Sequence, residues 1–154
     1  MLRSKKIIIV SHCILNQNSV VYPLARAKGA LKFVKSLIDE GYGFIQLPCP
    51  ELRHLGITRQ PMNKVQYDTT EFRDFCKLLA LPIIDEIVMY INNGYIIEGI
   101  IGINGSPTCS ITTNRGIFME EFLKESKMKE IELNYIEVPS NYKDDEDYDK
   151  VTLK

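Results

Sequence analysis

Four short runs of mainly apolar, β-branched residues are spaced along the chain and predict four buried β-strands. The runs cover residues 5–10, 44–47, 95–103 and 130–138. The first run is continuous rather than alternating, as expected for a strand that is covered on both faces. Proline or glycine stands beside the other three runs, where the chain must turn into a loop.

Between these runs, apolar residues recur at the three- and four-residue spacing of amphipathic helices. The segments with this spacing are residues 27–38, 68–92 and 118–123. Gly41 and Gly94 supply stop signals for the first two helices. Asp68 with Glu71 gives the second helix a start that resembles a capping box. Pro82 lies inside the second segment and predicts a kink or a break there.

Strands and helices therefore alternate along the chain, and this order predicts a single α/β domain over residues 1–140. We expect a small open parallel sheet of about four strands, in the flavodoxin-like or Rossmann-like order 2-1-3-4, with helices on both faces. Long loops are expected after the second strand, over residues 51–67, and after the third, over residues 104–115. Residues 141–154 form an acidic tail that we expect to be solvated and frayed.

Composition narrows the classes of function. The chain has 154 residues, and 19 basic against 20 acidic side chains give a net charge of −1. Because a basic excess is missing, a general nucleic-acid binder is disfavoured and a small-molecule partner is favoured. The apolar runs are too short to cross a membrane, and the start of the chain lacks the features of a signal peptide, so we expect a cytoplasmic protein. The sequence leaves the oligomeric state open, a homodimer included.

Three of the four cysteines follow predicted strands. Cys13 comes after the first strand, Cys49 after the second, and Cys109 lies in the loop after the third. Ligands of open parallel sheets bind beyond the carboxyl ends of the strands, and neighbouring strands lie about 4.8 Å apart, so these thiols should converge on one site. Cys76 lies instead on the apolar stripe of a helix, and we interpret it as a core residue.

Converging thiolates suit several chemistries. Soft sulfur ligands bind zinc, copper(I) or an iron–sulfur cluster, and three ligands without a fourth leave a coordination position open for substrate. His12 is not expected to complete the set, because residues adjacent in a strand point to opposite faces. Two of the cysteines could instead serve as acid and base in a cofactor-independent racemase or isomerase. A low-molecular-weight phosphatase loop is excluded, because its Cys-x5-Arg spacing places Ser19 where arginine is needed.

The segments around these cysteines together resemble the 2-thiouracil desulfidase family. Their sequences are Val-Ser-His-Cys-Ile-Leu at residues 10–15, Pro-Cys-Pro-Glu at residues 48–51 and Gly-Ser-Pro-Thr-Cys-Ser at residues 105–110. The resemblance covers about residues 5–115, the cluster-binding domain of that family. It implies that Cys13, Cys49 and Cys109 bind a [4Fe-4S] cluster whose fourth iron is free to capture the sulfur of a substrate. Zinc bound by the same cysteines is the alternative cofactor.

The resemblance also assigns residues around the substrate. Glu51, two residues beyond a cluster ligand, and Ser106 are implied as the catalytic acid and base. Arg59 matches the family's loop after the second cysteine and is assigned, with Asn16, to substrate binding. The implied function is that of an iron–sulfur-dependent desulfidase acting on a thiocarbonyl-containing small molecule. A metal- or sulfur-binding module without turnover, and the two-cysteine racemase or isomerase, stay open as alternatives.

Overall fold

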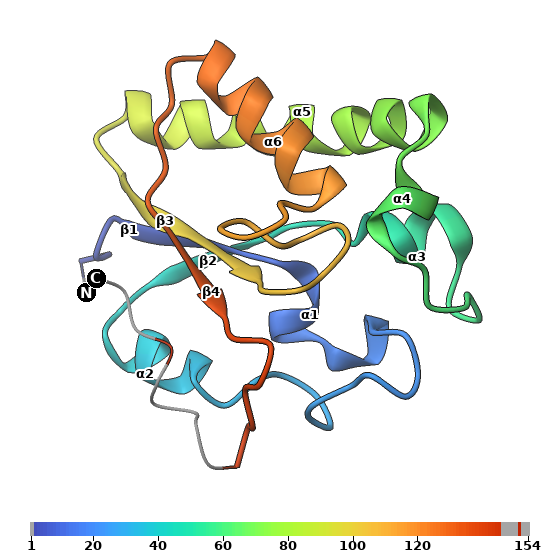
Figure 1. Ribbon diagram of the computed structural model, residues 1–154. Coiled ribbons are helices and arrows are strands. Elements are labelled where there is room, and N and C mark those ends of the chain that lie inside the picture. The colour runs from blue at the N-terminus through green and yellow to red at the C-terminus, as the bar shows by residue number, and fades with distance from the viewer. Residues whose placement is uncertain (1, 146–150, 152–154) are drawn as a thin grey trace.

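The computed structural model describes residues 2–145 and 151 and shows an α/β fold built on one four-stranded sheet (Figure 1). All neighbouring strands are parallel, and their order across the sheet is β2-β1-β3-β4. The strands are β1 (Lys6–Val10), β2 (Gly43–Gln46), β3 (Ile96–Ile103) and β4 (Tyr135–Val138). The predicted fold class and the predicted strand order 2-1-3-4 are therefore confirmed.

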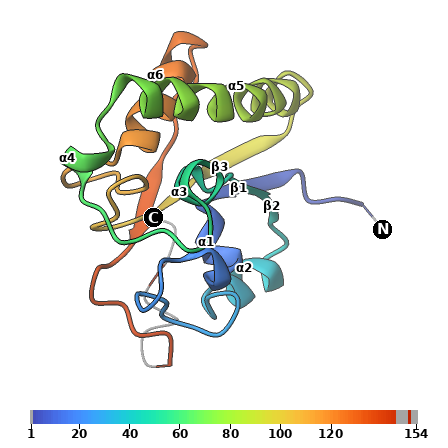
Figure 2. The same ribbon diagram turned by 90° about the vertical axis from the view of Figure 1, so that its right-hand side faces the viewer.

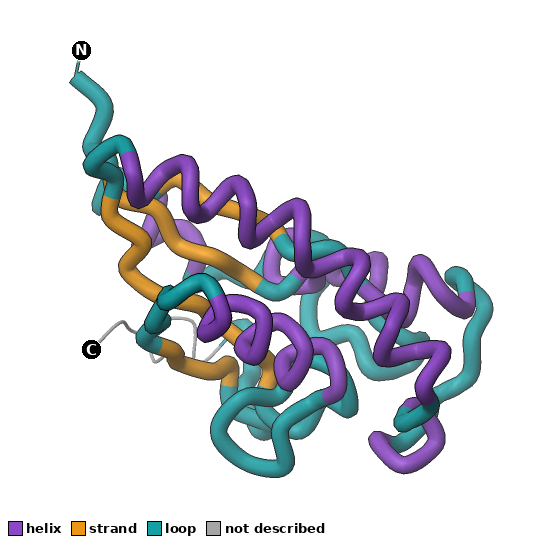
Figure 3. The backbone as a smooth tube through the Cα atoms, turned by 90° about the horizontal axis from the view of Figure 1, so that it is seen from above, coloured by secondary structure: helices purple, strands orange, loops and turns teal. Residues whose placement is uncertain are grey.

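Helices cover both faces of this sheet. They are α1 (His12–Leu15), the 3-10 turn η1 (Gln17–Ser19), α2 (Val34–Asp39), α3 (Pro50–Leu55), α4 (Lys64–Tyr67), α5 (Thr70–Asn92) and α6 (Ile117–Met128). Seen from above, α5 and α6 lie side by side over one face (Figure 3), whereas α2 lies on the opposite face (Figure 1). Among the described residues, no helix is both long enough and apolar enough to cross a membrane.

Two hydrophobic cores sit on the two faces of the sheet, and β1 contributes to both. Ile7 and Ile9 belong to the core under α5 and α6, whereas Ile8 and Val10 belong to the core under α2. Successive side chains of a strand point to opposite faces, so a strand between two cores must be apolar at every position. This requirement explains the unbroken apolar run that predicted β1.

The predicted helix over residues 27–38 is shorter in the structure, where only α2 forms. The backbone N–H of Gln17 donates to the carbonyl of Gly29 at 2.7 Å, and that of Leu31 donates to the carbonyl of Ile14 at 2.9 Å. These bonds tie the segment before α2 back to the segment after β1. Its backbone groups are therefore engaged outside a helical ladder.

The predicted loop over residues 51–67 is wrong in one respect, because it contains α3 and α4. Pro50 occupies the first turn of α3, where a missing N–H costs nothing, and the Cys49 sulfur accepts a bond from the Leu52 N–H at 3.4 Å. A capping box between Asn63 and Gln66 begins α4. The ends of such short polar helices are determined by their caps, and no apolar stripe reveals them in the sequence.

Helix α5 is confirmed, with two differences from the prediction. Its N-cap is Thr69 rather than Asp68, and the Thr69 hydroxyl accepts a bond from the Phe72 N–H at 3.1 Å. The helix also runs through Pro82 without a break. Proline removes the N–H that would bond the carbonyl of Leu78, but Leu78 is 68% exposed, so water can satisfy that carbonyl.

Two expectations near the end of the chain also need correction. The predicted strand over residues 130–138 is confined to β4, because the Ile131 N–H donates instead to the carbonyl of Ser126 and closes α6. The expected solvated tail begins with buried residues, Tyr142 and Asp144. The Asp144 carboxylate accepts bonds from the Lys32 N–H and the Tyr142 hydroxyl, both at 2.8 Å, which compensates its burial. Residues 146–150 and 152–154 of that tail lie outside the described residues.

Candidate functional site

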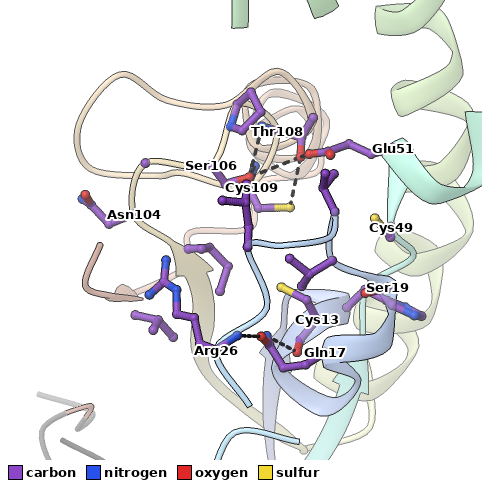
Figure 4. A pocket seen from close by; sticks show the side chains of 18 of the residues that line it. Cys13, Gln17, Ser19, Arg26, Cys49, Glu51, Asn104, Ser106, Thr108 and Cys109 are labelled. Carbon is purple, nitrogen blue, oxygen red and sulfur yellow. Dashed lines mark hydrogen bonds between the residues drawn. The ribbon is translucent and has the colours of Figure 1, made fainter. Parts of the chain in front are cut away.

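The carboxyl ends of the strands open onto a cavity of about 280 Å³ (Figure 4). Figure 2 looks at this end of the molecule, where α1 follows β1 and α3 follows β2. The cavity is lined by side chains from α1, η1, the segment after η1, the start of α3 and the loop after β3. It thus lies where open parallel sheets bind their ligands.

Cys13, Cys49 and Cys109 all line this cavity, and each is held there by a different local structure (Figure 4). Cys13 lies in α1, which begins two residues after β1 ends. Cys49 is the N-cap of α3. Cys109 is fixed in the loop after β3, where its backbone N–H donates to the Ser106 hydroxyl at 3.0 Å. The predicted convergence of three sequence-distant thiols at one site is therefore present in the structure.

Burial dominates the acid–base behaviour of these thiols. Burial and the neighbouring charge of Cys49 raise the pKa of Cys13 to about 12. Burial, followed by the charges of Cys13 and Cys49, raises the pKa of Cys109 well above its usual value. Burial also raises the pKa of Cys49. The charges of neighbouring thiols thus act on Cys13 and Cys109, as expected for groups that lie close together.

Cys76 is placed elsewhere, as the sequence predicted. It is fully buried in α5, among the apolar side chains of the core beneath α5 and α6, and it does not line the cavity. It therefore supplies a matched control for experiments on the other three cysteines.

Glu51 and Arg59 form a buried ion pair at the cavity wall. The Arg59 Nε atom lies 3.3 Å from Glu51 Oε1, and the two side chains are 3% and 12% exposed. The other guanidinium nitrogens of Arg59 donate to the carbonyls of Gly56, at 3.2 Å, and Ser19, at 2.7 Å. Through these bonds Arg59 orients Glu51 and ties α3 to η1, and it also lines the cavity, where its predicted contact with a substrate stays a prediction.

The Tyr67 hydroxyl is buried beside this ion pair. It has no hydrogen-bond partner among the described residues. Burial and the nearby charge of Glu51 raise the pKa of Tyr67 above its usual value, so the group stays a neutral phenol. The negative charge of Glu51 is thus close enough to act on the Tyr67 hydroxyl.

Ser106 lies at the turn of the loop after β3 and lines the cavity. Its oxygen accepts bonds from the backbone N–H groups of Cys109, at 3.0 Å, and Thr108, at 3.3 Å. With these two donors on its oxygen, its own proton remains available for an acceptor in the cavity. The geometry is therefore compatible with the predicted role of Ser106 beside a substrate.

Glu137 of β4 fastens the same loop from the other side. Its carboxylate accepts bonds from the N–H groups of Ile111, at 2.7 Å, and Thr112, at 3.1 Å, and from the Thr112 hydroxyl. Burial alone would raise the pKa of Glu137, but these donors outweigh it and lower the pKa below its usual value. The loop that carries Ser106 and Cys109 is thus anchored to the edge of the sheet.

Among the cavity residues that the sequence did not predict, two carry polar groups of interest, and one predicted residue is absent from the lining. Arg26 and Thr108 line the cavity. Arg26 donates to the carbonyl of Pro139 at 2.7 Å, and within the described part of the chain it pairs with no carboxylate. Asn16, predicted to bind substrate, instead caps η1 by accepting a bond from the Asn18 N–H, and it does not line the cavity.

The donor set of the cavity fits a group held by three thiolates. All of the cysteines are free, and three of them surround one space (Figure 4). Cys49 already accepts an N–H bond on sulfur, an interaction typical of iron–sulfur ligands. Among the described residues no group of three or more Cys, His, Asp and Glu side chains could hold a single metal ion. In a [4Fe-4S] cluster each cysteine binds a different iron, so its ligands need not meet at one point.

Comparisons with known proteins agree with this geometry. The family described as "Putative 2-thiouracil desulfurase" matches residues 5–143. The uncharacterized protein MJ0003 of Methanocaldococcus jannaschii is 51% identical over 144 residues, which cover 93% of this chain and 92% of that protein. No solved structure matches the chain.

Proposed function

Because the chain belongs to the 2-thiouracil desulfurase family, we propose that it removes sulfur from a small molecule that contains a thiocarbonyl group. The reaction exchanges C=S for C=O: one water is consumed, one hydrogen sulfide is released, and no atom is oxidised or reduced. The observation that carries the proposal is that three thiols, Glu51 and Ser106 line one cavity. Its volume of about 280 Å³ suits a small substrate.

We assign Cys13, Cys49 and Cys109 as the ligands of a [4Fe-4S] cluster that keeps one iron without a protein ligand. When bound, this group supplies a Lewis-acidic iron for the sulfur of the substrate. The assignment is supported by three free thiols at the ends of three adjacent parallel strands. Reduced cysteines belong in a reducing compartment, so we place the protein in the cytoplasm.

Glu51 and Ser106 carry the proton chemistry in this proposal. The Glu51 carboxylate accepts a proton from the water that adds to the thiocarbonyl carbon, and it returns a proton to the departing sulfur. Arg59 contacts one oxygen of that carboxylate at the cavity wall. The Ser106 hydroxyl donates a hydrogen bond to a heteroatom of the substrate, since its lone pairs accept two backbone N–H groups.

The first test is the iron and acid-labile sulfide content of protein reconstituted under strictly anaerobic conditions. We expect equal amounts of iron and sulfide in the wild type and in Cys76→Ser, and their loss in Cys13→Ser, Cys49→Ser and Cys109→Ser. The loaded protein is then incubated with 2-thiouracil and other thiocarbonyl heterocycles, and the released sulfide is measured.

Each outcome bears on the proposal. Sulfide release that requires the three cysteines supports a desulfidase. Zinc, or a bound cluster without sulfide release from any thiocarbonyl compound, would contradict the proposed activity and favour a binding module. Solvent deuterium exchange into a substrate by metal-free protein would favour the two-cysteine racemase or isomerase.

A further inference from the structure

Thr108 is a buried hydroxyl residue between two residues of the proposed site, Ser106 and Cys109. Its side chain points across the cavity wall toward Glu51 (Figure 4), and its Oγ1 atom lies 2.6 Å from Glu51 Oε2. The residue is 1% exposed. A hydrogen bond of this length to a carboxylate is among the strong ones, because the acceptor is charged.

The single proton of Thr108 has three neighbours, and their distances decide where it goes. Cys109 Sγ lies 3.7 Å away, Ser106 Oγ lies 3.4 Å away, and Glu51 Oε2 lies 2.6 Å away. The short, charge-assisted bond to Glu51 takes the proton. Thr108 can then only accept from Ser106, and the long 3.4 Å contact leaves the Ser106 proton free to turn to a substrate.

The backbone of Thr108 is held rigidly in place. Its carbonyl accepts a bond from the Met119 N–H at 3.1 Å, in the first turn of α6. Gly116, just before that helix, packs so closely that a Cβ atom there would lie 2.2 Å from the Thr108 carbonyl carbon. The side chain therefore projects from a fixed point, and its hydroxyl can fix whatever it contacts.

Glu51 has one anchor on each carboxylate oxygen. Arg59 Nε lies 3.3 Å from Oε1, and Thr108 lies 2.6 Å from Oε2. A carboxylate held at both oxygens has one orientation, whereas one held only by the longer Arg59 contact can rotate. The orientation of Glu51 toward the cavity thus depends on a residue from a different loop, 57 positions later in the chain.

We propose that Thr108 is a positioning residue, which acts on the reaction by orienting the Glu51 carboxylate rather than by touching the substrate or holding the cofactor. This inference rests on the proposed desulfidase function. It predicts that the Thr108 hydroxyl affects turnover, while substrate binding and cofactor content stay as in the wild type.

The test compares Thr108→Val, which removes the hydroxyl at similar size, with Thr108→Ser, which keeps it. Thr113→Val is the matched control, since Thr113 is exposed on the same loop. In anaerobically loaded protein, Thr108→Val should lower kcat about 10- to 100-fold, with KM within about twofold and unchanged iron and sulfide. Thr108→Ser should restore kcat to within about threefold of the wild type, and Thr113→Val should match the wild type.

A double-mutant cycle with Glu51→Ala tests whether Thr108 acts through Glu51. The double variant should turn over no more slowly than Glu51→Ala alone. Thermal unfolding gives a readout that does not depend on activity. The fall in Tm of the double variant should be smaller than the sum of the single falls by about 3–6 °C.

The outcomes separate the two proposals. If the wild type releases no sulfide, the desulfidase function fails, and the catalytic meaning of Thr108 fails with it. If the wild type is active, additive losses of kcat and Tm, a loss of iron in Thr108→Val, or a loss confined to KM would overturn the positioning role alone.

Discussion

Replacement of Glu137 by glutamine weakens the anchor of the loop that carries Ser106, Thr108 and Cys109. The carboxylate of Glu137 accepts bonds from two backbone N–H groups of that loop, at 2.7 and 3.1 Å, and from hydroxyl and amide side chains. A hydrogen bond to a charged group contributes about 1.5–3 kcal/mol. Glu137 is half-buried and glutamine keeps one acceptor oxygen, so we expect a loss of only about 2 kcal/mol in the free energy of unfolding.

In a chain of this length, 1 kcal/mol corresponds to about 2–4 °C in Tm, so Glu137→Gln should unfold about 4–8 °C below the wild type at pH 7. The pKa of Glu137 is lowered in the folded protein, mainly by its hydrogen-bond donors acting against the effect of burial. Its stabilisation is therefore complete above the unfolded-state pKa of about 4.3 and is lost as the pH falls through the lower folded-state pKa. The difference in Tm should thus stay constant from about pH 7 to pH 5 and shrink below about pH 4.

Circular dichroism melts of the wild type, Glu137→Gln and Glu132→Gln across this pH range measure the effect. Glu132 is an exposed glutamate just before β4, and its variant should melt within about 1 °C of the wild type. The reasoning would be refuted by a Glu137→Gln variant that melts with the wild type at pH 7. A difference that persists unchanged below the folded-state pKa would refute the assignment of the effect to the ionised carboxylate.

Three further changes follow from the same structure. In Arg59→Lys, the lysine ammonium cannot reach Glu51 and two carbonyls at once, so kcat for sulfide release should fall at least about tenfold and Tm by about 4 °C or more. A kcat equal to that of the wild type would contradict the orienting role of Arg59. Arg26→Ala removes a cavity cation that has no carboxylate partner among the described residues, so KM should rise about tenfold while Tm stays within about 2 °C of the wild type. An unchanged KM would show that the substrate does not reach Arg26. Pro82→Ala restores a helical donor to the Leu78 carbonyl, and Tm measured by calorimetry should rise by about 3–6 °C; a lower Tm would mean that the proline already fits the helix without strain.

The strands and the meeting of the cysteines could be predicted because both depend on local signals joined by one topological rule. The run from Ile7 to Val10 is apolar at every position, and the parallel sheet follows from alternation with helices. Once the order 2-1-3-4 is assumed, Cys13, Cys49 and Cys109 must lie together at the carboxyl ends of three adjacent strands. Periodicity and connectivity were sufficient for this part of the site.

The rest of the site depends on contacts that leave no periodic trace. Thr108 contacts Glu51 across 57 positions, and Arg59 contacts Ser19 across 40. Neither separation is marked by spacing, composition or a turn signal. Thr108 belongs to the third cysteine segment, and only its place between two predicted site residues, Ser106 and Cys109, could have drawn attention to it.

Helix α3 and the end of the chain were misjudged for a related reason. The N-cap of α3 is a cysteine, a residue type outside the usual capping set, so the start of the helix was marked by Pro50 and Glu51 without a usual cap before them. The acidic run near residue 144 favoured a solvated tail, but a single aspartate that meets two donors can be buried. Average charge describes a segment poorly when one of its members has specific partners.

The segment that returns from η1 to α2 is fastened at its base and free at its tip. The bonds from Gln17 to Gly29 and from Leu31 to Ile14 close the base, while Tyr22 at the tip is 89% exposed. Val20, Val21 and Leu24 of this loop line the cavity. Because loop-closure entropy rises only slowly with length, residues can be inserted at the exposed tip at little cost to stability. One wall of the cavity can therefore vary in length among relatives. Such changes would alter which substrates fit, while the sheet and the three thiols stay unchanged.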